Sequence, residues 1–551
     1  MKTDIQIAQN AKLEKITKIA QRLNLEDDAL ELFGETKAKL NRDKIENTSI
    51  GKLVLVSAIN PTPAGEGKTT TNIGLSMALN KLGYPAISAL REPSLGPCFG
   101  MKGGATGGGY AQVVPMDEIN LHFTGDFHAI TSAHNLLAAM IDNHIFHGNE
   151  LKIDPDHIHF KRVMDMNDRA LRSITVGDVG LSKSIPHESG FDITVASEIM
   201  AILCLAEDLD DLKERLGNIL VAYTFDEKPV FAKDLKAVGA MALLLKDAIK
   251  PNLVQTLENT PAIIHGGPFA NIAHGCNSLI ATKTSMALCD YTITEAGFGA
   301  DLGAEKFLNI KCRKGNIEPD AIVLVATIRA LKYNGGQKLL DLNEESLETL
   351  EKGLPNLERH FENLKQYGVP VVITINAFPS DTENEFNFLK AWGEEKGVEV
   401  VRSDVFSHGS TGGIKLAEAV IEACSKPKDF KFLYPENIGL KEKVEMIAVK
   451  TYGAKDVHFS EKALEKLARF EAMDQDFSVC MAKTQYSFSH DPKKLGAPSG
   501  FTLNIQDVRL SNGARFVVCY AGNIMTMPGL PKKPAAEGMD LMNDGTILGL
   551  S

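Results

Sequence analysis

The segment from residue 59 to residue 70 constrains the fold of this chain more than any other. An apolar run typical of a β-strand, residues 53–59, precedes it, and a run typical of a helix follows it. The letters between them read TPAGEGKT, with two glycines ahead of Lys68 and Thr69. A strand, a glycine-containing turn, Lys-Thr and a helix gather backbone N–H groups, a helix N-terminus and a lysine around one anion. The segment therefore predicts a cradle for the phosphates of a nucleotide.

The match to the pattern G-x-x-x-x-G-K-[ST] departs at one position, because Thr62 stands where the first glycine is expected. We expect Lys68 to reach the terminal phosphates and the Thr69 hydroxyl to ligate Mg²⁺. An incidental Gly-Lys turn is the alternative, and the strand and helix on either side favour the cradle. The predicted nucleotide-binding residues are Thr62, Pro63, Ala64, Gly65, Glu66, Gly67, Lys68 and Thr69.

Length, charge and cysteine pattern narrow the class of protein. The chain has 551 residues, which on size alone predicts about two to four domains. Its formal net charge of -12 argues against a nucleic-acid partner, because nucleic-acid binding needs clustered Lys and Arg. The eight cysteines include no C-x-x-C pair, so we expect neither a zinc site nor a disulfide framework. This pattern favours a reducing compartment.

The N-terminal region predicts a helix and no targeting segment. Its apolar stretches are too short for a signal peptide, and no apolar run approaches the roughly 20 residues needed to cross a bilayer. Ile16, Ile19, Ala20 and Leu23 recur at helical spacing, which predicts an amphipathic helix packed on the body of the protein. We expect a cytoplasmic protein without a membrane partner.

Strand and helix patterns alternate along nearly the whole chain, which predicts an α/β fold with a mainly parallel sheet. Residues 53–59 and 86–92 are expected to be strands, and the helix between them is expected to end at Gly83. A helix at 356–367, a glycine and a strand at 370–376 repeat this order.

We predict a P-loop NTPase-like, mainly parallel core with two further α/β lobes. The core is expected from residues 1–135 and 298–353, an inserted α/β lobe from 136–297, and a C-terminal α/β domain from 354–551. The last boundary depends on Gly353 and Pro355, which we expect to interrupt a charged helical region.

Arg91 and Glu92 lie at the carboxyl end of the second predicted strand. Charged residues at the carboxyl edge of a parallel strand lie where α/β proteins bind ligands. Arg91 is suited to holding a small carboxylate or phosphate in a bidentate fashion, and Glu92 to ligating a cation or orienting Arg91. An ion pair at the surface is the alternative, and the residues alone leave both interpretations open.

Two further segments follow this strand. Residues 102–110 read KGGATGGGY, and so many glycines indicate close approach of the backbone to a ligand or, as the alternative, a flexible linker. Next come His122, Asp126 and His128, which are suited to acid–base work or metal binding. Structural support of the glycine-rich loop is an equally good interpretation of the histidines.

Two later segments predict additional ligand-facing turns. Residues 295–307 follow a predicted strand, and residues 325–336 run from an apolar strand into a turn with Arg329 and Lys332. The second turn is suited to binding an anion. Either turn has a simpler interpretation as a strand end followed by solvated charge.

Together these strings resemble the formate–tetrahydrofolate ligase family over essentially the whole chain. The strings that carry the resemblance are TPAGEGKT at 62–69, KGGATGGGY at 102–110 and VATIRALKYNGG at 325–336, in the family's order. Two positions depart from the family. Thr106 stands where the family usually has alanine, and Phe406 replaces a tryptophan commonly found there. The only tryptophan of this chain, Trp392, lies elsewhere.

The resemblance implies ATP-dependent formation of 10-formyltetrahydrofolate from formate and tetrahydrofolate, through formyl phosphate, in one-carbon metabolism. It implies that Lys68 and Mg²⁺ assist phosphoryl transfer and that Arg91 holds formate and then formyl phosphate. Glu92 would place Arg91 or a monovalent cation, and Asp126 would take the proton from N10. The family also implies a homotetramer with small-molecule substrates.

By the same resemblance the pterin lies between Phe378–Pro379 and Phe406, and the C-terminal domain contributes the folate site. Stacking on such rings favours a flat aromatic ligand. Phe298 is expected near the adenine of the nucleotide or at the domain junction. Ordinary core packing is the alternative for each phenylalanine.

Two other functions fit part of the sequence. A P-loop switch or partition ATPase explains residues 62–69 but leaves the glycine-rich loop and the later aromatic turns without a role. Another ATP-dependent carboxylate ligase with a different acceptor is the second alternative.

Overall fold

The computed structural model describes residues 2–45, 50–62, 65–101, 104–177, 185–473 and 476–550. Within these ranges a 12-stranded sheet forms the centre of the molecule. In order across the sheet lie β1 (Leu30–Phe33), β2 (Lys37–Leu40), β14 (Asn252–Thr256), β15 (Pro261–Ile264), β4 (Ala86–Leu90), β16 (Tyr291–Glu295), β3 (Lys52–Ala58), β17 (Ala321–Ala326), β18 (Val371–Asn376) and β19 (Val400–Ser403). Outside this order, β6 (Ala111–Val114) pairs with β14, and β5 (Gly107–Gly108) pairs with β6.

Every neighbouring pair from β15 to β19 is parallel, whereas the pairs among β1, β2, β14, β15, β5 and β6 are antiparallel. The predicted α/β fold with a mainly parallel sheet is therefore confirmed. Parallel pairing has a consequence for function, because it brings the carboxyl ends of β4, β16, β3, β17 and β18 to one edge of the sheet.

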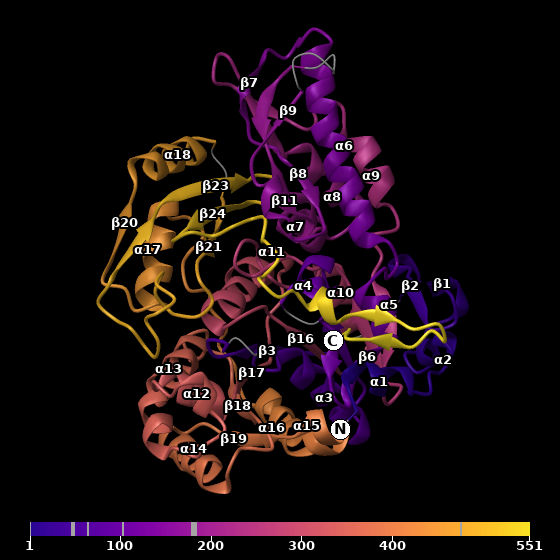
Figure 1. Ribbon diagram of the computed structural model, residues 1–551, viewed down its shortest axis with the longest axis vertical. Helices are drawn as coiled ribbons and strands as arrows, with labels where there is room; N and C mark the ends of the chain where they lie inside the picture. The colour runs from indigo at the N-terminus through magenta and orange to yellow at the C-terminus, as the bar shows by residue number, and fades with distance from the viewer. Residues whose placement is uncertain are drawn as a thin grey trace.

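The alternation of side chains along β3 shows how the core forms on both faces of this sheet. Leu53 and Leu55 join one apolar cluster, with residues of α10 (Leu279–Leu288) and α13 (Leu347–Lys365). Val54, Val56 and Ala58 join another, with residues of α3 (Lys68–Lys81) and α16 (Ile414–Ser425). In Figure 1 the sheet is covered by helices on both faces.

Two lobes extend from the central sheet. The magenta lobe at the top of Figure 1 contains α6 (Asp126–Phe146), α7 (Glu198–Leu205), α8 (Leu209–Gly217) and α9 (Val238–Leu245), with β7 (Ile153–Ile158), β12 (Leu220–Thr224) and β13 (Pro229–Phe231). The lobe at the left, orange to yellow, contains α17 (Leu440–Lys450) and α18 (Glu461–Glu471), with β20 (Asp456–Phe459), β21 (Ser478–Ala482), β22 (Thr502–Ile505), β23 (Asp507–Ser511) and β24 (Phe516–Tyr520). We call it the C-terminal lobe.

The expected domain boundaries do not coincide with the edges of the central sheet. Strands β14, β15 and β16 come from residues 136–297, and β18 and β19 come from residues 354–551, yet all five pair into this sheet. The two regions thus each supply both strands to the core and a lobe outside it. Whether the segments fold as independent domains stays a prediction.

Helix α13 contradicts one expectation. Gly353 and Pro355 lie inside it, so the predicted interruption of the helix is wrong. Proline inside a helix costs about 3 kcal/mol, and burial of a large apolar side chain contributes about 1.5–3 kcal/mol. The helix buries four such side chains, Leu350, Leu357, Phe361 and Leu364, which together outweigh the proline.

The N-terminal region forms two short helices, α1 (Asp4–Gln9) and α2 (Ile16–Gln21). Ile16, Ile19, Ala20 and Leu23 are all buried, which confirms the predicted amphipathic helix. The eight cysteines fall within the described ranges, and each is buried and free. In the part of the chain that the structure describes, no helix is both long and apolar enough to cross a membrane.

Candidate active site

The cradle loop, residues 62–69, connects β3 to α3 as predicted. Two of its predicted binding residues, Pro63 and Ala64, lie outside the described residues. Gly65 and Gly67 have φ angles of 82° and 75°, a conformation that glycine adopts without strain. Gly67 directly precedes α3, so the free N–H groups of the first helical turn and the positive end of the helix dipole lie next to the loop.

Asn376, at the end of β18, explains why residue 67 must be glycine. Its Nδ2 donates to the Glu66 carbonyl oxygen at 3.2 Å. A Cβ added to Gly67 would lie 2.3 Å from the same nitrogen. The side chain of Asn376 therefore occupies the space that any larger residue at position 67 needs, and holds the main chain of the loop in place.

The Glu66 side chain points into the protein. The Thr62 N–H donates to Oε1 at 2.7 Å, and the Thr327 hydroxyl donates to Oε2. Burial raises the pKa of Glu66, and these hydrogen bonds act in the opposite direction. Glu66 thus joins the start of the loop, at Thr62, to Thr327 at the end of β17. It is a positioning residue for the loop.

Glu295, the last residue of β16, joins two predicted site residues. Its Oε2 accepts a hydrogen bond from the Thr69 hydroxyl at 2.8 Å, and its Oε1 lies 3.5 Å from a terminal nitrogen of Arg91. The three residues come from neighbouring parallel strands or their extensions: β3 and α3 for Thr69, β16 for Glu295, and β4 for Arg91. The shared carboxyl edge therefore assembles a hydroxyl, a carboxylate and a guanidinium.

Lys68 is the first residue of α3 and is half-buried. Burial lowers the pKa of its amine, and the Glu295 carboxylate partly counteracts this effect. A cation in such a low-dielectric position interacts with an anion more strongly than it would in water. The amine is thus well placed to attract a phosphate group bound at the loop.

Arg91 keeps donors available for a ligand. The distances to its protein acceptors are long, 3.5 Å to both the Pro268 carbonyl oxygen and Glu295. Its Nε is buried without a hydrogen-bond partner. A Cβ added to Gly297 would lie 2.8 Å from the guanidinium, so glycine is needed there for the side chain to fit. This geometry suits an anion that accepts two hydrogen bonds.

Glu92 faces a cavity of about 430 Å³. The cavity is lined by apolar side chains, with Asp165 and the exposed His122 and His128 among its polar residues. Glu92 is buried, and its Oε2 has no hydrogen-bond partner. Burial and then the nearby Asp126 raise the pKa of Glu92 well above its usual range. An unpartnered buried carboxyl group beside a cavity suits a ligand that donates a proton or carries positive charge.

Asp126 is the first residue of α6 and forms a buried ion pair. Its Oδ1 lies 2.7 Å from Lys39 Nζ, and its Oδ2 accepts from Asn252 at 2.8 Å. Both carboxylate oxygens are therefore already engaged by protein donors. This contact argues against the predicted role of Asp126 in taking the N10 proton, and that role stays a prediction.

No group of three or more potential metal ligands occurs in the described ranges.

The predicted pterin walls have different surroundings. Phe378 is half-buried, and the guanidinium of Arg329 lies 4.8 Å from its ring centre. Pro379 beside it is exposed. Phe406, in the short helix α15 (Val405–His408), is 39% exposed. Each ring thus has solvent-accessible surface for a stacking ligand, and Arg329 occupies one face of Phe378.

Phe298 follows β16 with a φ of 57°, which is a strained conformation for a bulky residue. Its turn includes Gly299, where an added Cβ would lie 2.6 Å from the Asp301 carboxylate. Phe298 lies three residues after Glu295, at the same edge of the sheet. Its predicted contact with adenine stays a prediction.

The glycine-rich loop approaches protein atoms. Lys102 and Gly103 lie outside the described residues. A Cβ on Gly109 would lie 2.1 Å from the Phe406 carbonyl oxygen, and one on Gly104 would lie 1.8 Å from the Asn120 side chain. The Tyr110 N–H donates to the same Phe406 oxygen at 2.8 Å. In the described part of the loop, Gly109 makes room for α15 and Gly104 makes room for Asn120. The expected approach of the loop to a ligand stays a prediction.

The structure also corrects the predicted role of Lys332. We expected it to contribute to an anion-binding turn, but its side chain is fully buried. Its Nζ lies 2.8 Å from Glu385 Oε1 and donates to the Glu344 carbonyl oxygen at 2.8 Å. The helical spacing in α12 (Ile328–Asn334) directs it into the protein, and Arg329 is the basic residue of this segment that lies near a predicted site residue.

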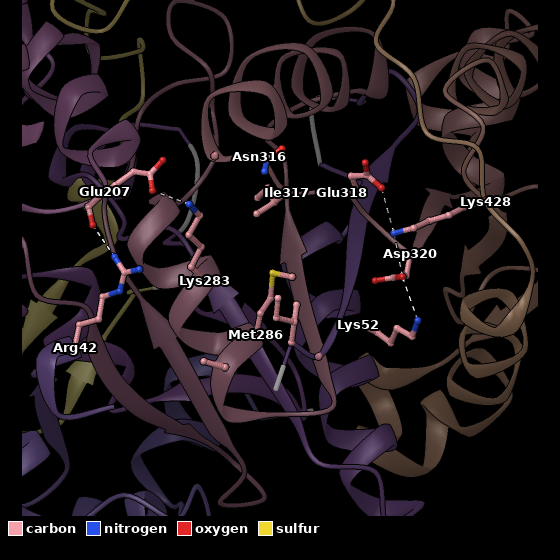
Figure 2. Close-up of a pocket in the computed structure, with 14 residues that line it drawn as sticks. Arg42, Lys52, Glu207, Lys283, Met286, Asn316, Ile317, Glu318, Asp320 and Lys428 are labelled. Carbon is pink, nitrogen blue, oxygen red and sulfur yellow. Dashed lines mark hydrogen bonds and ion pairs between the residues drawn. The ribbon is translucent and has the colours of Figure 1, made fainter. Parts of the chain in front are cut away.

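A larger cavity, of about 640 Å³, lies at the opposite edge of the sheet. Figure 2 shows its charged side chains, which pair with one another: Lys52 and Lys428 with Asp320, and Lys283 with Glu207. Lys52 begins β3 and Asp320 precedes β17, so the cavity lies at the amino ends of the parallel strands. None of the predicted site residues lines it.

Comparison with known proteins identifies the family of this chain. A family model described as formate–tetrahydrofolate ligase matches residues 2–551. The chain belongs to that family. Its members are ATP-dependent ligases, so the predicted enzyme class is confirmed. The resemblance carried by the three glycine-containing strings is confirmed as well.

Three residues of this ligase received no individual role from the sequence, although Glu295 and Thr327 lie in the two predicted ligand-facing turns. Glu295, Thr327 and Asn376 all lie at the carboxyl ends of strands neighbouring β3 or one strand removed from it. Their positions at strand ends were visible, but their contacts with the cradle loop depend on the order of strands in the sheet. A prediction of that order would have identified them.

The collision at Gly67 gives a first testable prediction. We expect Gly67→Ala to lower kcat/KM for ATP about 100-fold, equivalent to roughly 2.7 kcal/mol, because the new methyl group displaces Asn376 and the loop. Steady-state kinetics with varied ATP measures this effect.

Gly83→Ala is the matched control, because Gly83 follows the other end of α3 with a φ of 87° and has no atom within 4 Å of an added Cβ. It introduces similar backbone strain without a collision. We expect near-normal kinetics for this variant. Equal activity of Gly67→Ala and Gly83→Ala would contradict the proposed packing.

Proposed function

We propose that this ligase forms 10-formyltetrahydrofolate from formate, tetrahydrofolate and ATP through formyl phosphate. The observation that carries the proposal is the convergence of Lys68, Thr69, Arg91 and Glu295 at one edge of the sheet. A phosphate-binding loop lies there beside an arginine with available donors. A nucleotide triphosphate and a small carboxylate can therefore be held next to each other.

The reaction begins with activation of formate. A formate oxygen attacks the γ-phosphorus of ATP, and the bond from that phosphorus to the bridging oxygen of ADP breaks. Negative charge accumulates on the transferring group, and stabilising this charge supplies most of the catalysis of phosphoryl transfer. Lys68 and the backbone N–H groups at the N-terminus of α3 provide positive charge and hydrogen bonds for it.

The site fits Mg²⁺ as the ion that accompanies the nucleotide. The Thr69 hydroxyl and the Glu295 carboxylate lie 2.8 Å apart and are oxygen donors of the kind Mg²⁺ prefers. We assign Thr69 as the protein ligand, with Glu295 orienting it. When bound, the ion would offset charge on the triphosphate.

Arg91 holds formate and then formyl phosphate. Its guanidinium offers a planar pair of donors that matches the two oxygens of a carboxylate. Glu92 follows it in the chain, and the unpartnered oxygen of Glu92 fits a monovalent cation in the adjacent cavity. Such a cation would favour the ionised form of this carboxyl group, whose pKa is raised by burial and by Asp126.

The second step consumes formyl phosphate. N10 of tetrahydrofolate attacks the formyl carbon, the bond from that carbon to the phosphate oxygen breaks, and the departing inorganic phosphate takes up the proton that N10 releases. We place the pterin against Phe378–Pro379 and Phe406, whose rings offer exposed or half-buried faces. Stacking contributes about 0.5–1.5 kcal/mol beyond the area buried. Exclusion of water at this step prevents hydrolysis of the anhydride.

Substrate dependence of ADP formation tests this function. We expect ADP to appear only when formate and tetrahydrofolate are both present, because turnover requires transfer of the formyl group. Lys68→Ala is expected to reduce turnover about 1,000-fold or more, since it removes the charge that stabilises phosphoryl transfer. A coupled assay of ADP release measures both effects.

The alternatives predict different results in the same assay. A switch ATPase would release ADP without folate and respond to a protein partner. A ligase for another acid would activate that acid without tetrahydrofolate. Wild-type turnover in Lys68→Ala would contradict the assignment of the cradle loop.

Arg91→Ala tests the formate site. We expect the KM for formate to rise about 10–100-fold, because hydrogen bonds to a charged group contribute about 1.5–3 kcal/mol. The dissociation constant of ATP, measured by calorimetry, should change little. Arg91→Lys is the control, because it keeps the charge but loses the planar pair of donors. An unchanged formate dependence in Arg91→Ala would contradict the assignment.

A further inference from the structure

Asn60 lies between the end of β3 and the cradle loop and is almost fully buried. Its backbone N–H donates to His360 Nε2 at 3.0 Å. Its Nδ2 donates to Asp301 Oδ1 and to the Gln485 carbonyl oxygen, both at 3.2 Å. Its Oδ1 accepts from Asn356 at 2.9 Å. Asn60 therefore fixes the direction in which the chain enters the loop.

The contact with Asp301 leads to a buried ion pair. Asp301 Oδ2 lies 2.6 Å from Lys483 Nζ, and both side chains are 0% exposed. Lys483 directly follows β21 in the C-terminal lobe, and its amine also donates to the carbonyl oxygens of Thr484 and Ser487. Asp301 thus accepts from Lys483 on one oxygen and from Asn60 on the other.

The rest of this network agrees with a fixed arrangement. Burial lowers the pKa of His360 to about 4, so its ring is neutral and can accept the Asn60 N–H. Asp301 lies in a π-helical segment, Ala300–Ala304, and such segments are rare and frequent at functional sites. A buried ion pair by itself contributes little net stability, whereas loss of one partner is strongly destabilising. A role in positioning Asn60 would explain the presence of the Asp301–Lys483 pair.

We propose that Lys483 is a positioning residue for the nucleotide site. Through Asp301 it holds Asn60, and Asn60 sets the entry of the cradle loop in the conformation that receives the triphosphate. The C-terminal lobe thereby supports the loop without contacting the nucleotide. This inference rests on the proposed binding of ATP at residues 62–69.

Equilibrium binding of Mg-ADP to the full-length protein tests the proposal. Asn60→Ala removes the hydrogen bond to Asp301 and leaves the Asp301–Lys483 ion pair complete. Lys483→Met removes the cation of that pair. The third variant carries both changes. We expect the dissociation constant of Mg-ADP and the KM for ATP to rise at least about tenfold in each single variant. The KM values for formate and tetrahydrofolate should change less than about twofold. The double variant should bind Mg-ADP no more weakly than whichever single variant binds it more weakly. Both residues act through one chain of contacts, so their effects should not add.

Lys443→Met is the matched control for loss of a buried lysine in the same lobe. Lys443 is 3% exposed and lies 2.6 Å from Asp476, with no recorded bond to the loop among the described residues. It is expected to lower the melting temperature but leave Mg-ADP binding unchanged. An equal loss of binding in Lys443→Met and Lys483→Met would overturn the proposal, because the effect would then be general destabilisation.

Lys68→Ala separates this inference from the proposed function. If Lys68→Ala weakens Mg-ADP binding and folded Asn60→Ala binds like the wild type, the loop binds nucleotide and the positional role of Lys483 is wrong. If Lys68→Ala also binds like the wild type, the proposed site itself is wrong. Should Lys483→Met fail to fold, Asn60→Ala decides: weaker binding supports the proposal and unchanged binding refutes it.

Discussion

Parallel pairing of β4, β16, β3 and β17 is the constraint on which this site depends. Each strand ends at the same edge, so four chain segments that are distant in sequence deliver their next residues to one place. Thr69, Arg91 and Glu295 meet there although more than 200 residues separate the first and the last. A change in the order of these strands would disperse the hydroxyl, the guanidinium and the carboxylate together.

The loop that receives the proposed triphosphate is held in place by the ends of neighbouring strands. Asn376 fills the space beside Gly67, and the Thr327 hydroxyl donates to Glu66. These contacts are made by the ends of β18 and β17 and fix the main chain before any ligand arrives. A preorganised loop spends little binding free energy on ordering itself, which is the condition for strong electrostatic stabilisation.

The strands and helices around the site, the cradle loop and the family could be predicted from the sequence. Each of them depends on residues that are adjacent in the chain. The strand–loop–helix pattern at 53–81 needed only local information, as did the buried helix with Ile16 and Ile19. Glu295 and Asn376 escaped assignment because their contacts depend on strand order. The contact between Gly109 and Phe406 could not be predicted for a related reason, because nearly 300 residues separate the two in the chain.

Every role proposed for this site depends on the binding of the ATP phosphates by residues 62–69, next to Arg91. A crystal structure of the protein with Mg-ADP measures this most directly. We predict the terminal phosphate of ADP against the N–H groups at the start of α3, with Lys68 Nζ in contact and the Thr69 hydroxyl oxygen on the ion while its proton stays on Glu295. Nucleotide bound elsewhere, with the loop vacant, would contradict the claim.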